Sequence, residues 1–187
     1  MMIVDGVCKS YGEKTVLENF SCKFPEGVTV IMGASGRGKT TLLRLLMGLE
    51  SPDAGRITGV PERVAAVFQE DRLPMDFTPV ACVMMTAPRG TRREDVAAQL
   101  CSVGLGDELK KPVRELSGGQ RRRVAVVRAI AAKPEALFLD EALTGLDDEI
   151  KKTVANYIVE GSRGIVVAAV THDEDDAALL GGKILRM

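Results

Sequence analysis

Four runs of mostly apolar residues are each followed by glycine or by polar residues. The runs span residues 28–32, 63–68, 136–139 and 164–170. Apolar runs of this length are typical of strands buried on both faces, as in a parallel sheet that helices cover. The segments after three of these strands have helical patterns, at residues 42–47, 121–132 and about 147–160. The chain is therefore predicted to be an α/β protein.

The rest of the pattern adds two further parts. Residues 73–115 favour helices: Thr78-Pro79 opens one, and residues 91–94 form a capping box for another that stops at Gly104. Before the first core strand, the pattern predicts an antiparallel β portion. Its strands are expected at residues 2–7, 16–24 and 56–60, with turns at 11–12, 25–27 and 51–55, and a last core strand is expected at 183–186.

We expect a single domain over residues 1–187. Within it, residues 1–72 and 116–187 would form the sheet core with its β portion, and residues 73–115 a small helical subdomain. Together with the phosphate-binding loop at residues 33–40, described below, these parts predict a phosphate-loop NTPase core, a mainly parallel sheet flanked by helices, with an N-terminal antiparallel β portion and a small helical insert.

Composition narrows the function classes. Hydrophobic residues make up 45% and charged residues 27%, and the formal net charge of −1 gives no field that would draw the chain to nucleic acid or anionic lipid. The four cysteines are scattered without a C-x-x-C pair, which argues against a disulfide or zinc site. No apolar run could span a bilayer, and no signal-peptide pattern is present. We expect a cytosolic chain that reaches a membrane only through a partner.

The segment after the first core strand fits G-x-x-x-x-G-K-[ST], a phosphate-binding loop. A strand before it and a helix after it supply the context that the motif requires, which disfavours an ordinary glycine-rich turn. Backbone N–H groups of such a loop form an anion site at the helix start. Lys39 would contact the β- and γ-phosphates, and the Thr40 hydroxyl is placed to bind Mg²⁺. The loop comprises Gly33, Ala34, Ser35, Gly36, Arg37, Gly38, Lys39 and Thr40, and Thr41 follows it.

Polar residues also follow the other three core strands. They are Gln69, the pair Asp140-Glu141, and His172. The carboxyl ends of parallel strands lie at one edge of a sheet, where α/β proteins place their chemistry. Acidic residues often simply end strands, and a lone histidine is usually a surface or core residue. Beside a phosphate loop, we interpret Asp140 as a Mg²⁺ partner, Glu141 as a base that polarises water, and His172 as a phosphate sensor.

Two other features have two interpretations each. Tyr11 is either a half-buried aromatic at a strand end or a ring that stacks on a base. Residues 121–123 are three arginines, interpreted as a solvated helix face rather than a nucleic-acid patch. Just before them, Ser117 is a natural N-cap, and two glycines leave the helix start bare for an anion. That motif reads Leu116, Ser117, Gly118, Gly119 and Gln120.

With these residues in order, the sequence resembles the nucleotide-binding subunit of an ABC transporter over essentially its whole length. Residues 116–120 match the family's signature, which most other phosphate-loop ATPases lack. Residues 67–74 are similar to importers of the nitrate, sulfonate and taurine type. The resemblance implies ATP as substrate, Mg²⁺ as cofactor and ATP hydrolysis that powers a transporter.

The resemblance also implies the role of each site residue. Two such domains would close head to tail, so that Ser117 and Gly119 donate to the γ-phosphate held by the opposite subunit. The catalytic group would be Lys39, Gln69, Glu141 and His172, with Thr40, Gln69 and Asp140 at the metal, Tyr11 on the adenine and Asp147 against the partner subunit. Residues 69–79 would meet a cytoplasmic helix of separate permease subunits at the inner face of the cell membrane. An importer would also use an extracytoplasmic solute-binding protein, and no nucleic acid is implied.

The sequence departs from the family at two site positions and in its length. Ala142 stands where the family has a proline after the catalytic glutamate, and Arg37 replaces a small residue. We expect the Arg37 side chain to point to solvent and leave ATP binding intact. The chain ends about one strand after His172, without the C-terminal extension of many importers, so we expect weaker dimer contacts and slow hydrolysis by the isolated domain.

Two alternatives come from other function classes. A soluble ABC-type ATPase could act as a mechanical switch on nucleic acid or the ribosome, although such proteins usually have a second tandem domain or a long coiled-coil insertion, and the net charge near zero opposes it. A regulatory binder without hydrolysis would not need the intact set of Lys39, Asp140, Glu141 and His172.

Overall fold

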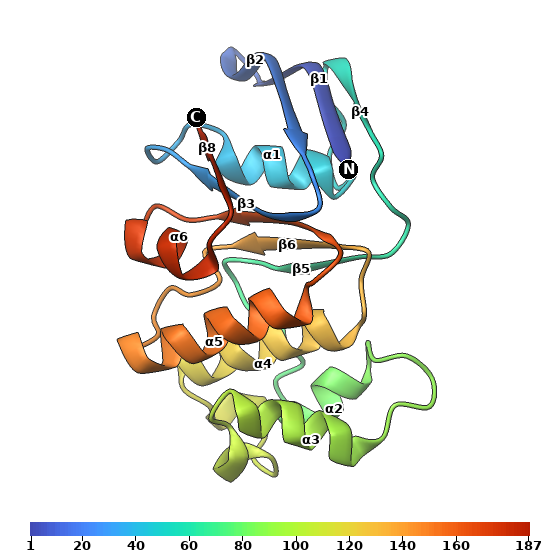
Figure 1. The fold of residues 1–187 in the computed structure, drawn as a ribbon, viewed down its shortest axis with the longest axis vertical. Helices are drawn as coiled ribbons and strands as arrows, with labels where there is room; N and C mark the ends of the chain where they lie inside the picture. The colour runs from blue at the N-terminus through green and yellow to red at the C-terminus, as the bar shows by residue number, and fades with distance from the viewer.

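The computed structural model describes residues 1–187 and contains two sheets with a helix between them (Figure 1). The antiparallel sheet has the order β2-β1-β4, and the parallel sheet has the order β5-β6-β7-β3-β8. The predicted α/β class is confirmed. The strands are β1 (Met2–Tyr11), β2 (Lys14–Phe24), β3 (Gly27–Met32), β4 (Ala54–Thr58), β5 (Val64–Val67), β6 (Ala136–Asp140), β7 (Val166–Val170) and β8 (Lys183–Arg186).

Helix α1 (Lys39–Leu46) fills the space between the two sheets. Its four leucines are buried in one cluster with Phe24 of the antiparallel sheet and Phe138 of the parallel sheet. Both long sides of α1 therefore contact apolar side chains, and the helix holds the two sheets together.

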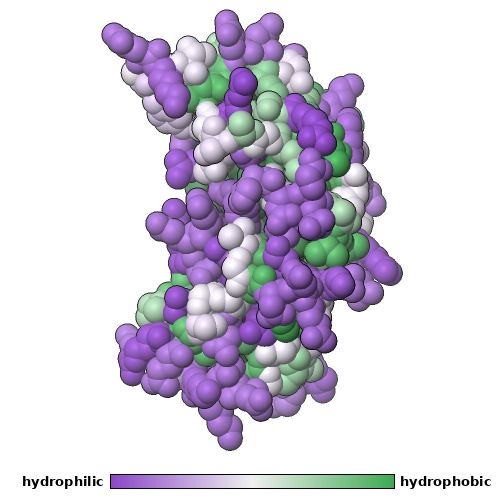
Figure 2. Space-filling model, turned by 90° about the vertical axis from the view of Figure 1, so that its left-hand side faces the viewer, coloured by the Kyte–Doolittle hydropathy of each residue, from purple (hydrophilic) through white to green (hydrophobic).

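The opposite face of the parallel sheet is covered by α4 (Gly118–Ala131) and α5 (Asp148–Gly161), with α6 (Glu174–Leu180) beside them (Figure 1). Strand residues alternate between the two faces. Leu137 and Leu139 pack in the cluster with α4 and α5, whereas Phe138 packs against α1. The outer surface in Figure 2 is mostly hydrophilic, and its hydrophobic residues form separate patches.

Between β5 and α4 the chain forms α2 (Pro79–Met84), α3 (Arg93–Ser102) and two short 3₁₀ turns (Gly106–Glu108 and Val113–Glu115). These helices pack on the side of α4 away from the sheet (Figure 1). The two ends of the segment are joined, because the Val113 N–H donates to the Phe77 carbonyl at 2.8 Å and the Arg114 N–H to the Met75 carbonyl at 2.9 Å. No helix of the chain is both long enough and apolar enough to cross a bilayer.

Several predicted boundaries are wrong in informative ways. Strand β1 continues to Tyr11, so the turn consists of Gly12 and Glu13, and β4 begins at Ala54 inside the predicted turn.

Thr78 does cap α2, accepting from the Ala81 N–H at 3.3 Å. The predicted capping box at residues 91–94 does not form. Arg92 occupies the N-cap of α3 and pairs with Asp95, while the Thr91 hydroxyl donates to the Pro88 carbonyl at 2.8 Å.

Candidate functional site

A cavity of about 620 Å³ opens where the strands of the parallel sheet end. The loops after β3, β5, β6 and β7 all reach it, because parallel neighbours end at the same edge. The lining comprises Tyr11, Lys14, Val16, Ser35, Gly36, Gly38, Lys39, Thr40, Thr41, Gln69, Arg122, Asp140, Glu141, Thr144, Val170 and His172. The structure thus brings together the phosphate loop and all four strand-end residues predicted from the sequence.

The phosphate loop has a conformation that its glycines permit. Gly38 has φ +88° and is the N-cap of α1, and a Cβ there would lie 2.7 Å from the Cγ1 of Val16. The bare start of α1 therefore faces the cavity with its free N–H groups, which suits an anion. The Lys39 ammonium is held within the loop, donating to the Gly33 carbonyl at 2.7 Å and the Ala34 carbonyl at 3.0 Å.

Asp140 ends β6 and is a buried residue, at 6% exposure. The Thr40 hydroxyl donates to it at 3.5 Å, a weak contact that leaves most of its acceptor capacity free. Burial raises the pKa of Asp140, and the Thr40 hydrogen bond offsets part of that rise. A buried carboxylate, a hydroxyl and the side chain of Gln69 around one cavity form a set of oxygen ligands that fits Mg²⁺.

Glu141 and His172 form a close pair above the cavity. The Nδ1 of His172 lies 2.9 Å from Oε1 of Glu141, and the Thr144 hydroxyl donates to Oε2 of Glu141 at 3.2 Å. Glu141 has φ +54°, an unfavourable conformation for a side chain of this type and one that clusters at functional sites. The hydrogen bond and the negative charge of Glu141 raise the pKa of His172. Because the His172 side chain is 69% exposed, it can also reach a ligand in the cavity.

Tyr11 lies at the rim of the cavity, at the end of β1. Its ring is 45% exposed, its hydroxyl donates to the carboxylate of Glu50, and the Lys9 ammonium lies 5.6 Å from the ring centre. Tyr11 is therefore a partly exposed aromatic at a strand end, and its stacking on a base stays a prediction.

The predicted signature residues lie elsewhere. Ser117 caps α4, where its hydroxyl accepts from the Gln120 N–H at 3.2 Å and the Gln120 side chain accepts from the Ser117 N–H at 2.8 Å. This box makes α4 start at Gly118, three residues before the predicted start. Asp147 caps α5, accepting from the Ile150 N–H at 3.0 Å. None of the residues 116–120, nor Asp147, lines the cavity of its own chain.

Arg37 is exposed and absent from the cavity lining, as expected. The prediction of a solvated face for residues 121–123 is wrong. Arg122 is only 8% exposed, and Arg121 donates to the Leu116 carbonyl at 2.6 Å. Arginine stems can lie along the protein while their heads bond to carbonyls of other segments, which a charge count along one helix does not reveal.

Sequence reasoning also missed five lining residues, which are Lys14, Val16, Arg122, Thr144 and Val170. Arg122 has a recognisable signal, because Val126 and Ala129 follow it at the i+4 and i+7 positions of the buried face of α4. The signal for Thr144 is weaker. It lies three residues after Glu141, and this spacing lets its hydroxyl reach back across a turn to the Glu141 carboxylate.

Comparisons of sequence and of fold with known proteins point to the same protein family. A family model described as ABC transporter matches residues 17–144. The chain is 38% identical to the "Aliphatic sulfonates import ATP-binding protein SsuB 3" of Rhodococcus jostii, covering 97% of this chain and 69% of that protein. It is 36% identical to the "Spermidine/putrescine import ATP-binding protein PotA" of Pasteurella multocida, covering 96% of this chain but only 53%, about half, of that protein.

Two solved structures of one cassette match the whole chain. The dimeric structure of MJ0796, described as a bacterial ABC transporter cassette, has a TM-score of 0.86 at 25% identity, covering 100% of this chain and 94% of that one. The same cassette in a post-hydrolysis state bound to ADP and Pi has a TM-score of 0.85 at 26% identity, with the same coverage.

Proposed function

Because this chain belongs to the ABC transporter family, we propose that it is the subunit that binds and hydrolyses ATP to drive an importer for a small solute. Similar chains named as import ATP-binding proteins support the direction of transport. The cargoes in their names range from sulfonates to spermidine and putrescine, so we propose no cargo more specific than a small solute.

One observation carries the ATPase proposal. Lys39, Asp140, Glu141 and His172 come from two strand ends and one helix start, yet they line the same cavity. That set contains a cation for phosphate, a buried carboxylate for a metal, a carboxylate for water and a histidine beside it. A protein that only bound nucleotide would need the first two and not the Glu141–His172 pair.

The chemistry follows from these contacts. ATP would occupy the cavity with its phosphates on the N–H groups of residues 33–41, and Lys39 would exchange its carbonyl contacts for phosphate oxygens. Glu141 would orient the attacking water and accept its proton. His172 would contact the γ-phosphate, and its raised pKa favours a proton on the ring to donate there. Tyr11 would stack on the adenine at the rim.

Mg²⁺ would be held by Thr40, Asp140 and Gln69, and when bound it would neutralise charge on the phosphates. The buried state of Asp140 supports this assignment, since a carboxylate with a raised pKa and one weak donor gains most from a cation.

A head-to-tail pair completes the proposed site. Ser117 and Gly118 are exposed and lie outside the cavity of their own chain, so a second chain would have to bring them to the nucleotide. The Ser117 hydroxyl and the Gly119 N–H would donate to the γ-phosphate of the partner, and Asp147 would contact the partner near the same interface. The dimeric state of the similar cassette supports this arrangement.

Residues 69–79 are the proposed contact with permease subunits. Met75 and Phe77 are exposed large hydrophobic residues in this stretch, and they lie where the helical segment leaves the sheet. In this proposal residues 73–115 act as a helical subdomain that passes ATP-driven closure to a permease, with the chain peripheral on the inner face of the cell membrane. An extracytoplasmic solute-binding protein would deliver the cargo.

The test is ATP hydrolysis by the purified chain across protein concentrations, beside Glu141→Gln. We expect the rate per chain to rise with concentration, because two chains form each site. Glu141→Gln should lose hydrolysis and form an ATP-dependent dimer in size exclusion. A flat rate per chain, with an active and monomeric variant, would refute the proposal.

Mixing two inactive variants isolates the head-to-tail geometry. Lys39→Ala damages the phosphate loop and Ser117→Arg blocks the signature, so each alone should form no active pair. A mixed pair would contain one intact site, with Lys39 and Ser117 from different chains, and should regain hydrolysis. If the mixture stays inactive although both variants dimerise, the two elements do not meet across the interface.

A further inference from the structure

Helix α4 holds the backbone of the loop that bears Gln69. Arg122, nine-tenths buried, donates from Nη1 to the Phe68 carbonyl and from Nη2 to the Gln69 carbonyl at 2.5 Å. Its Nη1 also lies 3.3 Å from Oδ1 of Asp71. One guanidinium therefore binds two successive main-chain carbonyls and a carboxylate of the same loop.

Arg128 extends this contact. It lies six residues further along α4, about 9 Å along the helix axis at 1.5 Å per residue. Its Nη1 donates to the Arg72 carbonyl at 3.0 Å and its Nη2 to the Asp71 carbonyl at 3.4 Å. Two arginines of one helix thus hold four of the five carbonyls of residues 68–72.

Apart from Leu73, which is buried in the core at its end, the loop has little else to fix its path. Residues 68–73 form no main-chain to main-chain hydrogen bond. Arg72 has φ +44°, and its guanidinium packs 4.3 Å from the centre of the Phe68 ring within the same loop. The position of Gln69 therefore depends on α4, and most directly on Arg122, which lines the cavity beside it.

Arg122 and Ser117 belong to one rigid element. Ser117 caps the helix, and Arg122 follows in its second turn. Any displacement at the start of α4 is carried to Arg122, since helical hydrogen bonds keep the turns together. The guanidinium then moves the backbone that it binds.

We propose that Arg122 is a positioning residue that couples the signature at the start of α4 to Gln69 in the cavity of the same chain. The idea rests on the ATP hydrolysis and head-to-tail pairing proposed above. A nucleotide held by the partner and touching Ser117 would, through Arg122, change the placement of Gln69 at the other nucleotide. The two sites of the pair are in this way linked through each chain.

The residue type matters to this link. A planar guanidinium offers parallel N–H groups that match two neighbouring carbonyls, whereas a lysine ammonium is a point donor and does not reproduce the fork. Arg122→Lys keeps the charge and should hold the loop in part. Arg122→Gln loses both the charge and the fork.

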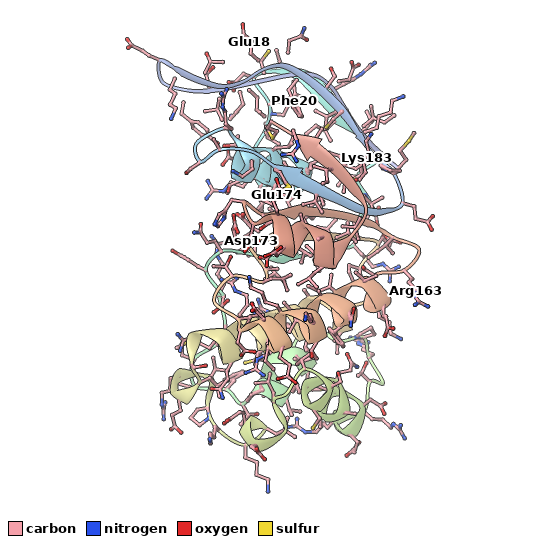
Figure 3. All side chains as sticks on the ribbon, turned by 60° about the vertical axis from the view of Figure 1, so that its left-hand side comes forward. Glu18, Phe20, Arg163, Asp173, Glu174 and Lys183 are labelled. Atoms are coloured by element: carbon pink, nitrogen blue, oxygen red, sulfur yellow. The ribbon has the colours of Figure 1, made fainter.

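Two measurements on the full chain test the proposal. The first is limited proteolysis by trypsin without nucleotide, read at Arg72, an exposed residue of the loop. Arg122→Gln should be cleaved after Arg72 faster than the wild type, with no faster cleavage elsewhere in the chain, and Arg122→Lys should lie between them. Arg163→Gln is the matched control, because Arg163 is exposed just beyond the end of α5 (Figure 3) and should leave the loop unchanged.

The second measurement is steady-state hydrolysis. Displacing a group in the site by about 1 Å can cost about a hundredfold, so kcat of Arg122→Gln should fall by roughly ten- to a hundredfold. The KM for ATP should change far less, since the phosphate loop is untouched, and Arg122→Lys should recover part of kcat.

The outcomes separate this proposal from the proposed function. If the wild type does not hydrolyse ATP, the function fails, and trypsin cleavage after Arg72 still decides whether Arg122 holds the loop. An unchanged cleavage rate in Arg122→Gln would overturn the proposal. So would faster cleavage at sites throughout the chain with a lower Tm, because that result means a general structural role.

Discussion

The Nδ1 of His172 lies 2.9 Å from a carboxylate oxygen of Glu141, and these two residues follow neighbouring parallel strands. Glu141 is kept in place on its other oxygen by Thr144 and by its own N–H, which donates to the Val170 carbonyl at 3.0 Å. The base and the histidine are thus preset by the sheet before any nucleotide binds.

The pair predicts the titration of His172. As the only histidine, it gives a single imidazole signal in NMR, and its pKa should lie above the ordinary 6.5 because Glu141 favours the charged ring. In Glu141→Gln the pKa should fall back toward that value. The control Asp107→Asn, an exposed carboxylate that makes no contact with the ring, should leave the pKa unchanged. An unshifted wild-type pKa would contradict the pair.

The same shift has a consequence for stability. A raised folded-state pKa means that the pair stabilises the fold fully below the unfolded pKa of 6.5, and that this contribution is lost as the pH rises through the folded pKa. The difference in Tm between wild type and Glu141→Gln should therefore be largest near about pH 6 and shrink in more alkaline buffer. A difference that grows with pH would have the wrong sign.

Asp140→Asn should separate stability from activity. Burial raises the pKa of Asp140, so its charge opposes folding at neutral pH and costs less as the pH falls through the folded pKa. The variant should keep or raise the Tm at pH 7. Hydrolysis should fall at least about tenfold, as for other changes at metal sites, and should need more Mg²⁺ to reach half its maximum. A large drop in Tm would mean that Asp140 serves the fold rather than the metal.

Lys151 neutralises a buried acid next to the histidine loop. Its ammonium lies 2.8 Å from Oδ1 of Asp176, which is almost fully buried, and 3.4 Å from Asp173, the residue after His172 at the start of α6 (Figure 3). Lys151→Met leaves the buried Asp176 charge without a partner, so the free energy of unfolding measured in urea should fall by about 3 kcal/mol. The neighbouring exposed Lys152→Met should cost no more than about 0.5 kcal/mol. Equal losses of unfolding free energy in the two variants would show that the buried ion pair stabilises the fold no more than the exposed Lys152 does.

Gly38 is predicted to be less replaceable than Gly36 of the same phosphate loop. Gly38→Ala adds a methyl 2.7 Å from Val16 at φ +88°, whereas Gly36→Ala has φ +78° but no atom within 4 Å of its new Cβ. Backbone strain alone should cost Gly36→Ala about 1–2 kcal/mol, and the clash should add about 1–3 kcal/mol at Gly38. Thermal unfolding compares the two, and binding of a fluorescent ATP analogue shows whether the loop still closes on phosphate. Equal losses of stability in the two variants would mean that the Val16 side chain moves to make room for the new methyl group.

Much of the site could be predicted from sequence because its chemistry sits at strand ends. Glu141 and His172 follow apolar runs, and a parallel sheet brings such positions to one edge whatever lies between them. The Ser117 cap is also local, since its partner Gln120 is three residues away. Features of this kind need only the period of the pattern and the residues nearby.

The misses have two causes, distant partners in one case and competing local contacts in the other. Arg122 is buried because the carbonyls of Phe68 and Gln69, more than fifty residues earlier, lie beside it. The box at residues 91–94 fails because Thr91 bonds to Pro88 and Arg92 to Asp95, an alternative that a motif match does not weigh. A helix face that looks charged in sequence can thus be an internal contact.

The hydrogen bonds of Val113 to Phe77 and of Arg114 to Met75 make residues 75–114 a loop with touching ends. A segment closed at its base is modular. Its exposed turn at residues 88–90 can change in length while β5 and β6 keep their register, because the base of the segment is closed by its own hydrogen bonds. Met75 and Phe77, in the stretch proposed to face the permease, lie at this closed base, so that contact can stay in place while the far end of the segment is refitted.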